Sequence, residues 1–406
     1  MPKVQPLRVL VGAWRSGLSE TGGEWALIHS RNLALVNLGC EISMWCGGLP
    51  EVNGATDHLG TAGYPTVVRN SSQATARLFG QALGAEALRT NSDAIVVSGD
   101  RLLPGVLRRT RGKIPVVVDV HGSIREGWEY GGSVRRFVTY PTKAVITRIW
   151  YRNVDAALVV TSELGGEVRR MAPKLNAFVV PCSSLYRPSW GGLLEDRKRW
   201  RFILGIADED LVLVHSGGLG MYQHPDAMFR ALVQVLDAGI PARLLLATRK
   251  VALARQCLAS QPEFVQRRTF VDDFPTGLHK QVLAAADAGL LLREPNRTNR
   301  AAFPNKVDEY WSSGLPVVTT PALRSVADLI GTTPPLGLVL RGQGGRFGER
   351  DIGSLRDILA GGVRGREQRF HAIAAARERI SFEITLQPFL DYLRRARAVR
   401  DRGVLG

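Results

Sequence analysis

Short apolar runs alternate with helical patterns along almost the whole chain, and this alternation limits the possible folds more than any other feature. Such runs are typical of buried parallel strands, and strands that alternate with helices indicate βαβ units. The first series of runs covers residues 7–11, 42–45, 94–97, 116–118, 156–161 and 177–181. The second covers residues 211–215, 243–247, 269–271, 288–292 and 316–319. We therefore predict an α/β protein with two doubly wound parallel sheets.

The length of 406 residues also favours two domains, because a single core stops growing well below that size. Between the two series, residues 186–201 are polar, aromatic and rich in arginine, with a proline and two glycines, and we place the linker there. We expect domains over residues 1–187 and 188–383. In doubly wound sheets a ligand binds at the carboxyl ends of the strands, so we expect it where these ends face a cleft.

The net charge of +16 favours anionic partners such as nucleotide diphosphates or an acidic membrane surface. The alternative is an arginine-rich composition without a specific partner. No zinc-finger or RNA-recognition signature is present, so we expect no nucleic-acid partner. The chain has no apolar run of about 18 residues and no apolar centre near its N-terminus, so we expect a cytoplasmic protein. The four cysteines lack the spacing of a zinc site or a disulfide framework.

The most specific motif lies within residues 283–321, where a polar loop leads to a helix that begins near Pro304. Proline suits a first helical turn, and the amides of such a turn attract phosphate. Lys306 and Glu309 are three residues apart and share one face of this helix. An ammonium group suits a diphosphate, and a carboxylate suits ribose hydroxyls. The motif therefore predicts a nucleotide-diphosphate site, the alternative being a surface ion pair.

The string P-x-K-x-x-E-Y at residues 304–310, followed by G-L-P-V-V at 314–318, resembles the donor-nucleotide motif of the retaining glycosyltransferases of the sucrose-synthase and mannosyltransferase type, the glycosyl transferases group 1. Residues 212–220 are similar to the family's first C-domain strand and glycine loop. Residues 21–24 resemble its N-terminal loop, and residues 118–122 its strand-end histidine. The last N-domain elements of the family resemble residues 155–162 and 179–182.

This resemblance extends over most of the chain and implies the GT-B architecture, in which two Rossmann-like domains face a cleft. The N-terminal domain would bind the acceptor and the C-terminal domain the donor. Residues 384–406 would form a final helix that packs back toward the N-terminal domain.

The resemblance also implies roles for particular residues. Lys306 would be a phosphate ligand, Glu309 the ribose ligand, and His121 a group beside the anomeric carbon. Glycines in two loops would allow a close approach of the backbone to the ligand. They are Gly22 and Gly23 in the first loop and Gly217 and Gly218 in the second. The remaining candidates for the donor site are Arg249, Lys250, Arg293, Pro304 and Asn305.

The chain departs from the family at three positions. Ala301 stands where the family often has a glutamate that contacts the donor sugar. Leu219 and His224 stand near the positions of an arginine and a lysine that neutralise the diphosphate. We therefore expect Lys306 to carry more of this charge, with help from the arginines and the lysine among the candidates.

From the resemblance we expect a retaining, metal-independent glycosyltransferase that uses a UDP- or GDP-sugar and no cofactor. The acceptor would be a glycan or glycolipid in cell-surface polysaccharide or glycoconjugate biosynthesis. Asp272 and Asp273 resemble a metal-binding pair only superficially. The alternatives are a non-catalytic GT-B scaffold, or a nucleotide-sugar epimerase or phosphorylase of the same fold. A dehydrogenase is not expected, since the G-x-G-x-x-G fingerprint is absent after the first strand.

Residues 134–152 combine basic and aromatic side chains in a helical segment of the N-terminal domain. This pattern suits a peripheral contact with an anionic membrane surface on the inner face of the cell membrane. The alternative is a helix whose aromatic face packs into the core. The arginine-rich tail at 394–400 would add attraction to anionic lipid or form a solvated end.

Overall fold

The computed structural model of the chain describes residues 5–14, 23–47, 63–69, 75–130, 132, 135–220, 223, 225–274, 278–342, 346–359 and 361–404. The chain divides into two compact units. Unit 1 comprises Met1–Leu185 and Ile380–Gly406, and unit 2 comprises Tyr186–Arg379. The divisions thus follow residues 185 and 379, whereas we expected them after residues 187 and 383.

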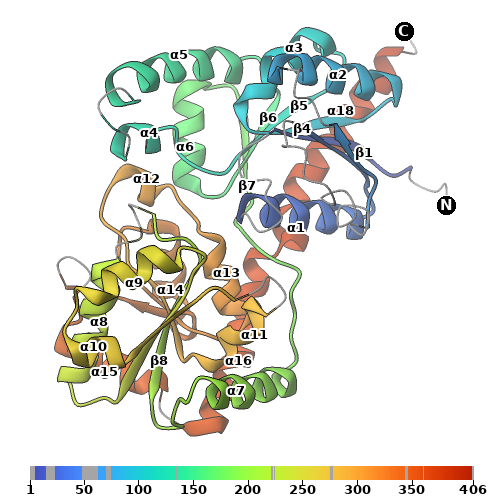
Figure 1. Cartoon of the computed structure of the whole chain (residues 1–406). Helices are drawn as coiled ribbons and strands as arrows, with labels where there is room; N and C mark the ends of the chain where they lie inside the picture. The colour runs from blue at the N-terminus through green and yellow to red at the C-terminus, as the bar shows by residue number, and fades with distance from the viewer. Residues whose placement is uncertain are drawn as a thin grey trace. The chain divides into compact units, whose positions relative to one another are not determined.

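Unit 1 contains a seven-stranded parallel sheet with the strand order β3-β2-β1-β4-β5-β6-β7. Its strands are β1 (Arg8–Trp14), β2 (Glu41–Gly47), β3 (Thr66–Arg69), β4 (Ala94–Ser98), β5 (Val116–Val120), β6 (Ala156–Val159) and β7 (Asn176–Val179). Its helices include α1 (Gly23–Asn37), α2 (Ala76–Arg89), α3 (Leu103–Thr110), α4 (Glu126–Glu129), α5 (Tyr140–Tyr151) and α6 (Ser162–Met171). Helix α1 lies on one side of the sheet and α2 and α3 on the other (Figure 1). This is the doubly wound arrangement that the alternating pattern predicts.

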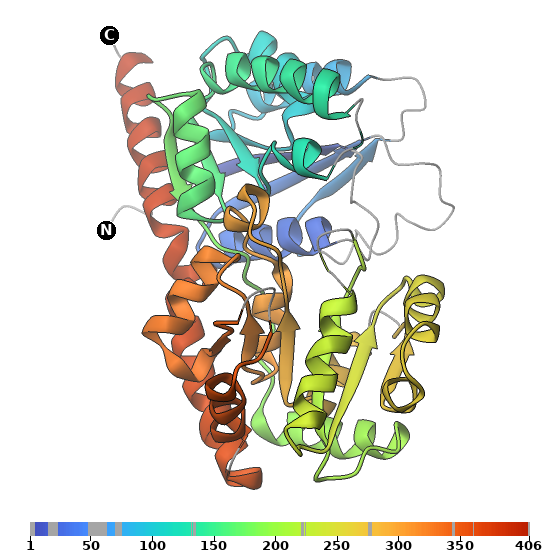
Figure 2. The same cartoon turned by 90° about the vertical axis from the view of Figure 1, so that its left-hand side faces the viewer.

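The last helix of the chain, α18 (Gln387–Val404), belongs to unit 1. It runs along this unit as the red helix at the upper left of Figure 2. The rings of Phe389 and Tyr392 lie 5.7 and 5.4 Å from the ring of Phe178 in β7. Arg397 and Arg400 both form ion pairs with the buried carboxylate of Asp93. Aromatic packing and ion pairs therefore attach the chain terminus to the N-terminal sheet.

Unit 2 contains a six-stranded parallel sheet with the strand order β10-β9-β8-β11-β12-β13. Its strands are β8 (Leu211–Ser216), β9 (Ala242–Ala247), β10 (Thr269–Asp272), β11 (Ala288–Leu291), β12 (Val317–Thr319) and β13 (Gly337–Val339). Its helices include α7 (Trp190–Ile203), α8 (Pro225–Asp237), α9 (Val251–Ala259), α12 (Arg297–Arg300), α13 (Asn305–Ser312), α14 (Arg324–Thr332), α15 (Glu349–Leu359) and α16 (Gly362–Arg377). Every predicted strand of both series is confirmed, whereas β3 and β13 were not predicted.

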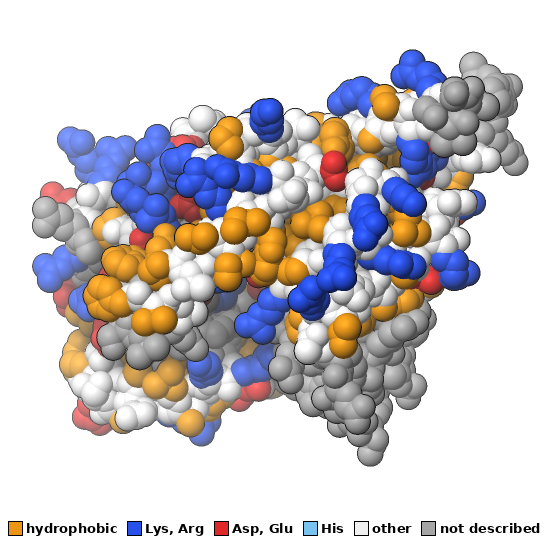
Figure 3. Space-filling model, turned by 90° about the horizontal axis from the view of Figure 1, so that it is seen from above, with side chains coloured by type: hydrophobic (Ala, Val, Ile, Leu, Met, Phe, Trp, Pro, Cys, Tyr) orange, Lys and Arg blue, Asp and Glu red, His pale blue; other side chains and the backbone are white. Residues whose placement is uncertain are grey.

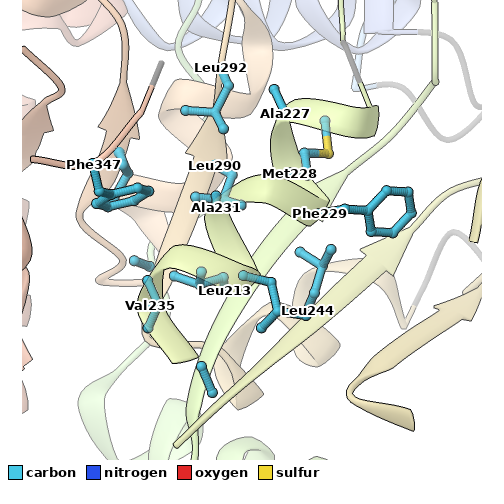
Figure 4. Packing of buried hydrophobic residues seen from close by; sticks show 14 of the residues in the cluster. Leu213, Ala227, Met228, Phe229, Ala231, Val235, Leu244, Leu290, Leu292 and Phe347 are labelled. Carbon is cyan, nitrogen blue, oxygen red and sulfur yellow. The ribbon is translucent and has the colours of Figure 1, made fainter. Parts of the chain in front are cut away.

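The core of unit 2 forms where α8 packs on the central strands. Leucines of β8, β9 and β11 meet apolar side chains of α8, as Figure 4 shows for Leu213, Leu244, Leu290, Ala231 and Val235. All five side chains are almost completely buried. Burial of apolar area on this scale is the main favourable term in folding, and it fixes the strands whose ends carry polar residues.

Most of the segment that we expected to be a linker is helix α7, which is part of unit 2. This prediction was wrong because two of its arginines are buried rather than solvated. Arg197 and Arg201 donate to the two carboxylate oxygens of Asp287 over 2.7 and 2.8 Å. Asp287 also accepts from the backbone amide of Val212, the second residue of β8, over 2.9 Å. One buried carboxylate thus joins α7 to the start of the central strands.

Replacing this carboxylate should destabilise unit 2 strongly. We expect Asp287→Ala to lower the free energy of unfolding by about 3–5 kcal/mol, because it leaves two buried guanidinium groups without their counter-ion. Chemical denaturation followed by circular dichroism measures the change. Asp328→Ala is the control, because its ion pair with Arg324 is exposed and should cost at most about 1 kcal/mol. Equal effects of the two substitutions would contradict the structural role of Asp287.

Candidate functional site

Helix α13 lies across the carboxyl ends of β8 and β11, the two central strands of unit 2. The ring of Tyr310 packs against Gly289 of β11 so closely that a Cβ atom there would lie 2.2 Å from the ring. The hydroxyl of Tyr310 accepts a hydrogen bond of 2.9 Å from the amide of Ser216, the last residue of β8. Sheet order reverses between β8 and β11, which is where ligands bind in doubly wound sheets. Tyr310 therefore anchors α13 at the expected ligand position.

Lys306, in the first turn of α13, lies against the glycine turn that follows β8. Gly217 has a φ of +96°, a conformation that favours glycine, and a Cβ atom there would lie 2.7 Å from Cε of Lys306. The Nζ atom of Lys306 is 3.5 Å from Nε2 of His215. Only glycine at position 217 thus provides both the turn and the space for the lysine.

The surroundings of Lys306 disfavour its charge. Burial lowers its pKa, the charge of Arg293 lowers it further, and the balance with Glu309 leaves the pKa at about 7. His215 is almost completely buried, and burial together with the charge of Lys306 holds its pKa well below the usual range. The neutral imidazole of His215 therefore lies beside the amino group of Lys306, which is only partly protonated near pH 7. An anion placed here would favour the charged form of the lysine.

Glu309 lies one turn further along α13 and points to the same strand end. Its Oε2 accepts a hydrogen bond of 3.2 Å from the hydroxyl of Ser216 and lies 3.7 Å from Nε2 of His279. Burial alone would raise its pKa, but His279, Lys306 and the Ser216 hydroxyl together lower it below the usual value. The carboxylate is therefore ionised at neutral pH, and 27% of the side chain is exposed.

The other donor-site candidates lie at neighbouring strand ends or at the start of α13. Arg249 and Lys250 are exposed just after β9, and Arg293 is buried just after β11. Gly218 directly follows Gly217, and its carbonyl lies 3.3 Å from Nε2 of His215. Pro304 is the residue that caps α13, and Asn305 is the first residue of the helix. The structure thus places all the unit 2 candidates around the carboxyl ends of three adjacent strands.

Of the positions where the sequence departs from the family, Ala301 is 1% exposed at the end of α12. Leu219 is also buried, with 4% exposure. Neither side chain presents a charge to a ligand, and His224 lies outside the described residues.

Sequence reasoning missed four residues of this site: His215, Ser216, His279 and Tyr310. The signal for the first two was a His-Ser pair at the end of an otherwise apolar strand. Tyr310 was part of the motif but had no assigned role. His279 comes from α11 (His279–Val282), far from the motif in sequence, and only folding brings its Nε2 within 2.9 Å of the Ser216 hydroxyl.

In unit 1, His121 follows strand β5 and belongs to a network of ion pairs. Its Nε2 lies 2.8 Å from Oδ2 of Asp119, which is buried and forms an ion pair with Arg31 of α1. Arg31 also donates to the carbonyl of Val180 over 3.2 Å. The Nδ1 atom of His121 lies 3.7 Å from a carboxylate oxygen of Glu24. The imidazole is thus oriented from one side by Asp119.

Although burial lowers the pKa of His121, the charge and the hydrogen bond of Asp119 outweigh it and raise the pKa to about 9. His121 is therefore an imidazolium at neutral pH, which donates hydrogen bonds and does not accept a proton. Gly23, which we expected beside the ligand, begins α1 next to Glu24, and Gly22 lies outside the described residues.

Among the described residues, no group of three or more histidine, cysteine, aspartate or glutamate side chains could hold a metal ion. No helix in the described ranges is both long and apolar enough to span a membrane.

Each unit has the Rossmann strand order, with its second and third strands on one side of the first strand and the later strands on the other. Two such units in one chain, with the terminal helix attached to the first, define the GT-B fold. The structure of Anabaena HepE in complex with UDP and glucose is similar, with 18% identity, a TM-score of 0.66, and coverage of 95% of this chain and 99% of that chain.

Two further solved structures have the same fold. Sucrose-phosphate synthase from Thermosynechococcus elongatus has 14% identity and a TM-score of 0.64, and covers 97% of this chain and 100% of that one. The E. coli trehalose-6-phosphate structure bound with UDP-2-fluoro glucose has 11% identity and a TM-score of 0.61, with 95% and 98% coverage. No protein-family model matches the sequence, and no curated protein matches it. The predicted GT-B fold is confirmed.

The raised pKa of His121 predicts how its contribution to stability depends on pH. The folded-state pKa of about 9 exceeds the ordinary value of 6.5, so this contribution is complete below pH 6.5 and is lost as the pH rises through 9. We expect His121→Gln to destabilise the protein by up to roughly 3 kcal/mol at low pH and by much less above about pH 9.5. Thermal unfolding across this range measures the difference, with the exposed His371→Gln as control. A difference that does not change with pH would contradict the ion pair.

Proposed function

We propose that this protein is a glycosyltransferase that moves a sugar from a nucleotide-diphosphate donor to an acceptor. The observation that carries the proposal is the position of Lys306 and Glu309 together at the end of β8, on a turn that only glycine can form. The GT-B fold supports it, because two of the similar structures hold UDP with glucose or a UDP-sugar analogue.

In this proposal unit 2 binds the nucleotide. The ammonium group of Lys306 meets the diphosphate, and backbone amides of the Gly217–Gly218 turn approach the same oxygens. The ionised carboxylate of Glu309 accepts hydrogen bonds from the ribose hydroxyls, while Ser216 and His279 hold it in place. Arg293, Arg249 and Lys250 add positive charge near the strand ends.

Transfer breaks the bond between the anomeric carbon and the diphosphate oxygen and forms a bond from that carbon to the acceptor oxygen. The nucleoside diphosphate leaves with the bonding electrons, and its leaving oxygen accepts the proton that the acceptor hydroxyl gives up. We propose that Lys306 and the backbone amides stabilise the growing negative charge without a metal ion. We also propose that the anomeric configuration is retained, on the basis of the motif resemblance.

We propose that unit 1 binds the acceptor and supplies His121 to the reaction. As an imidazolium ion, His121 stabilises negative charge or donates to a sugar hydroxyl, and it is not the base that removes the acceptor proton. The acceptor is proposed to be a glycan or glycolipid of cell-surface polysaccharide or glycoconjugate biosynthesis.

We further propose that the protein works at the inner face of the cell membrane and contacts anionic lipid through residues 134–152. Within this range α5 is a largely exposed helix, with Thr147 and Tyr151 as its buried residues. Phe137, Val145 and Ile149 are 66%, 61% and 55% exposed. This exposure favours the membrane contact over the alternative in which the segment packs into the core.

Ala301 favours one alternative, a scaffold that binds nucleotide without catalysis. Its buried methyl group provides no carboxylate for the hydroxyls of a donor sugar. Donor hydrolysis separates the two functions, because an enzyme slowly releases free sugar from its donor and a scaffold does not. If transfer occurs, magnetic resonance of the product shows whether the anomeric configuration is retained.

Substitutions of the two α13 residues should weaken nucleotide binding. We expect Lys306→Met and Glu309→Gln each to reduce the affinity for UDP or GDP by roughly 10- to 150-fold, since each removes a contact to a charged group. Isothermal calorimetry measures both. The matched controls are Lys198→Met and Glu195→Gln, an exposed pair with the same spacing on α7 of the same unit. Unchanged affinity in both α13 variants would refute the site.

Nucleotide binding should also take up a proton. The pKa of Lys306 is about 7 in the free protein, so a growing fraction of its amino group is neutral above pH 7. The diphosphate binds the protonated form, and binding at higher pH therefore takes up a proton. We expect the affinity for UDP to fall by up to about tenfold per pH unit above pH 7.5. Lys306→Arg should remove this dependence, because a guanidinium stays protonated. Calorimetry in buffers of different ionisation enthalpy measures the proton uptake, and its absence in the native protein would contradict the lowered pKa.

A further inference from the structure

A cavity of about 290 Å³ opens in unit 1 between the loop after β5, helix α5 and helix α6. Ile124 and Arg125 of the loop line it, four residues or fewer beyond His121. Helix α5 contributes Tyr140, Ala144, Val145 and Arg148, and α6 contributes Glu167, Arg170 and Met171. The cavity is distinct from the nucleotide site, which belongs to unit 2.

The lining of this cavity is positively charged. It contains three arginines and one carboxylate, Glu167. Glu167 accepts a hydrogen bond of 2.6 Å from the hydroxyl of Ser123 and lies 3.9 Å from Nε of Arg125. Arg148 and Arg170 form no ion pair with any described residue. Guanidinium groups remain charged and match phosphate oxygens in pairs, so this excess charge suits a phosphate group.

The rim of the cavity is apolar and exposed. Large hydrophobic side chains, each at least 38% exposed, gather on α5 and on the π-helix Arg135–Thr139 before it: Phe137, Val138, Val145, Ile146 and Ile149. Val145 belongs both to this group and to the cavity lining, so the two features are continuous. The rings of Phe137 and Tyr140 pack on Trp128 of α4, at 5.8 and 5.5 Å. Aromatic contacts thus join the start of this apolar surface to α4.

Basic and hydrophobic side chains adjoin on this face of the molecule. Figure 3 shows the face seen from above, where Lys and Arg side chains border hydrophobic ones. Helix α5 carries two of the basic side chains, Lys143 and Arg148, together with the exposed Val145, Ile146 and Ile149. An arrangement of cations around an apolar surface complements anionic lipid, in which phosphate groups lie directly above hydrocarbon.

We propose that the α5–α6 cavity binds the phosphate group of an anionic lipid while the apolar side chains of α5 enter the surrounding bilayer interface. The inference rests on the membrane contact proposed above and specifies its ligand. The cavity size supports a head group, since it is near the lower limit of roughly 300 Å³ for small-molecule sites. Lipid binding at this cavity does not depend on the proposed glycosyl transfer.

Vesicle sedimentation of the full chain tests the proposal, with vesicles of phosphatidylcholine alone or of phosphatidylcholine and phosphatidylglycerol in equal parts. We expect binding to the anionic vesicles only. The double substitution Arg148→Glu/Arg170→Glu should weaken it at least ~tenfold. Its matched control in unit 2, Arg255→Glu/Arg364→Glu, changes the net charge equally and should bind like the native protein.

Two further variants separate the parts of the site. Val145→Ser/Ile149→Ser should also lose binding, whereas Phe202→Ser/Ile203→Ser, which changes an exposed apolar pair on α7, should not. Ala144→Phe fills the cavity without changing any charge, and it should weaken binding if the head group enters. Native-like binding by Ala144→Phe would overturn the cavity as the phosphate site, and equal binding to neutral vesicles would overturn the charge recognition.

Calorimetry with UDP on the same variants keeps this inference separate from the proposed function. Vesicle binding is lost and UDP binding is kept if the inference is correct, because the two sites lie in different units. A native protein that binds UDP but neither kind of vesicle would refute the lipid site and leave the nucleotide site standing. Vesicle binding without UDP binding would refute the nucleotide site alone.

Discussion

The contact between Tyr310 and the central strands of unit 2 determines where the proposed nucleotide site lies. The ring packs on Gly289 and the hydroxyl accepts from the Ser216 amide, so α13 has one position relative to β8 and β11. This position brings Lys306 onto the glycine turn and Glu309 onto the Ser216 hydroxyl. The proposed binding of a diphosphate and a ribose thus depends on one aromatic side chain that touches neither.

Buried ionic contacts have a similar positioning role elsewhere in the chain. Asp119 accepts from Arg31 and holds the imidazole of His121 in its charged form. Asp287 holds two arginines of α7 at the start of β8, at the opposite end of that strand from the proposed nucleotide site. In each case a single carboxylate compensates cations that burial would otherwise make costly. The charge of +16 therefore includes arginines that stabilise the fold as well as arginines that face solvent.

Helix α5 differs from these elements because few of its side chains are buried. It is held through Thr147, which donates to Asp100 over 3.1 Å, and through the buried ring of Tyr151. Val145, Ile146 and Ile149 are exposed, and Val145 also lines the cavity with excess positive charge. These exposed side chains are the ones that we propose contact a membrane surface.

The sequence by itself determined the two parallel sheets, because runs such as 211–215 and 288–292 are too apolar to lie anywhere but inside. It also predicted that Lys306 and Glu309 share one face of a helix, since helical spacing places residues three apart on the same side. Only the tertiary structure decided which other residues surround the candidate residues in each unit. His279 contacts Ser216, which is 63 residues away in sequence, and Arg31 contacts Asp119, which is 88 residues away. Local sequence patterns do not predict contacts between residues so far apart. The arginines of α7 looked solvated in sequence for the same reason, because their counter-ion, Asp287, is supplied by a segment that only the folded core brings near.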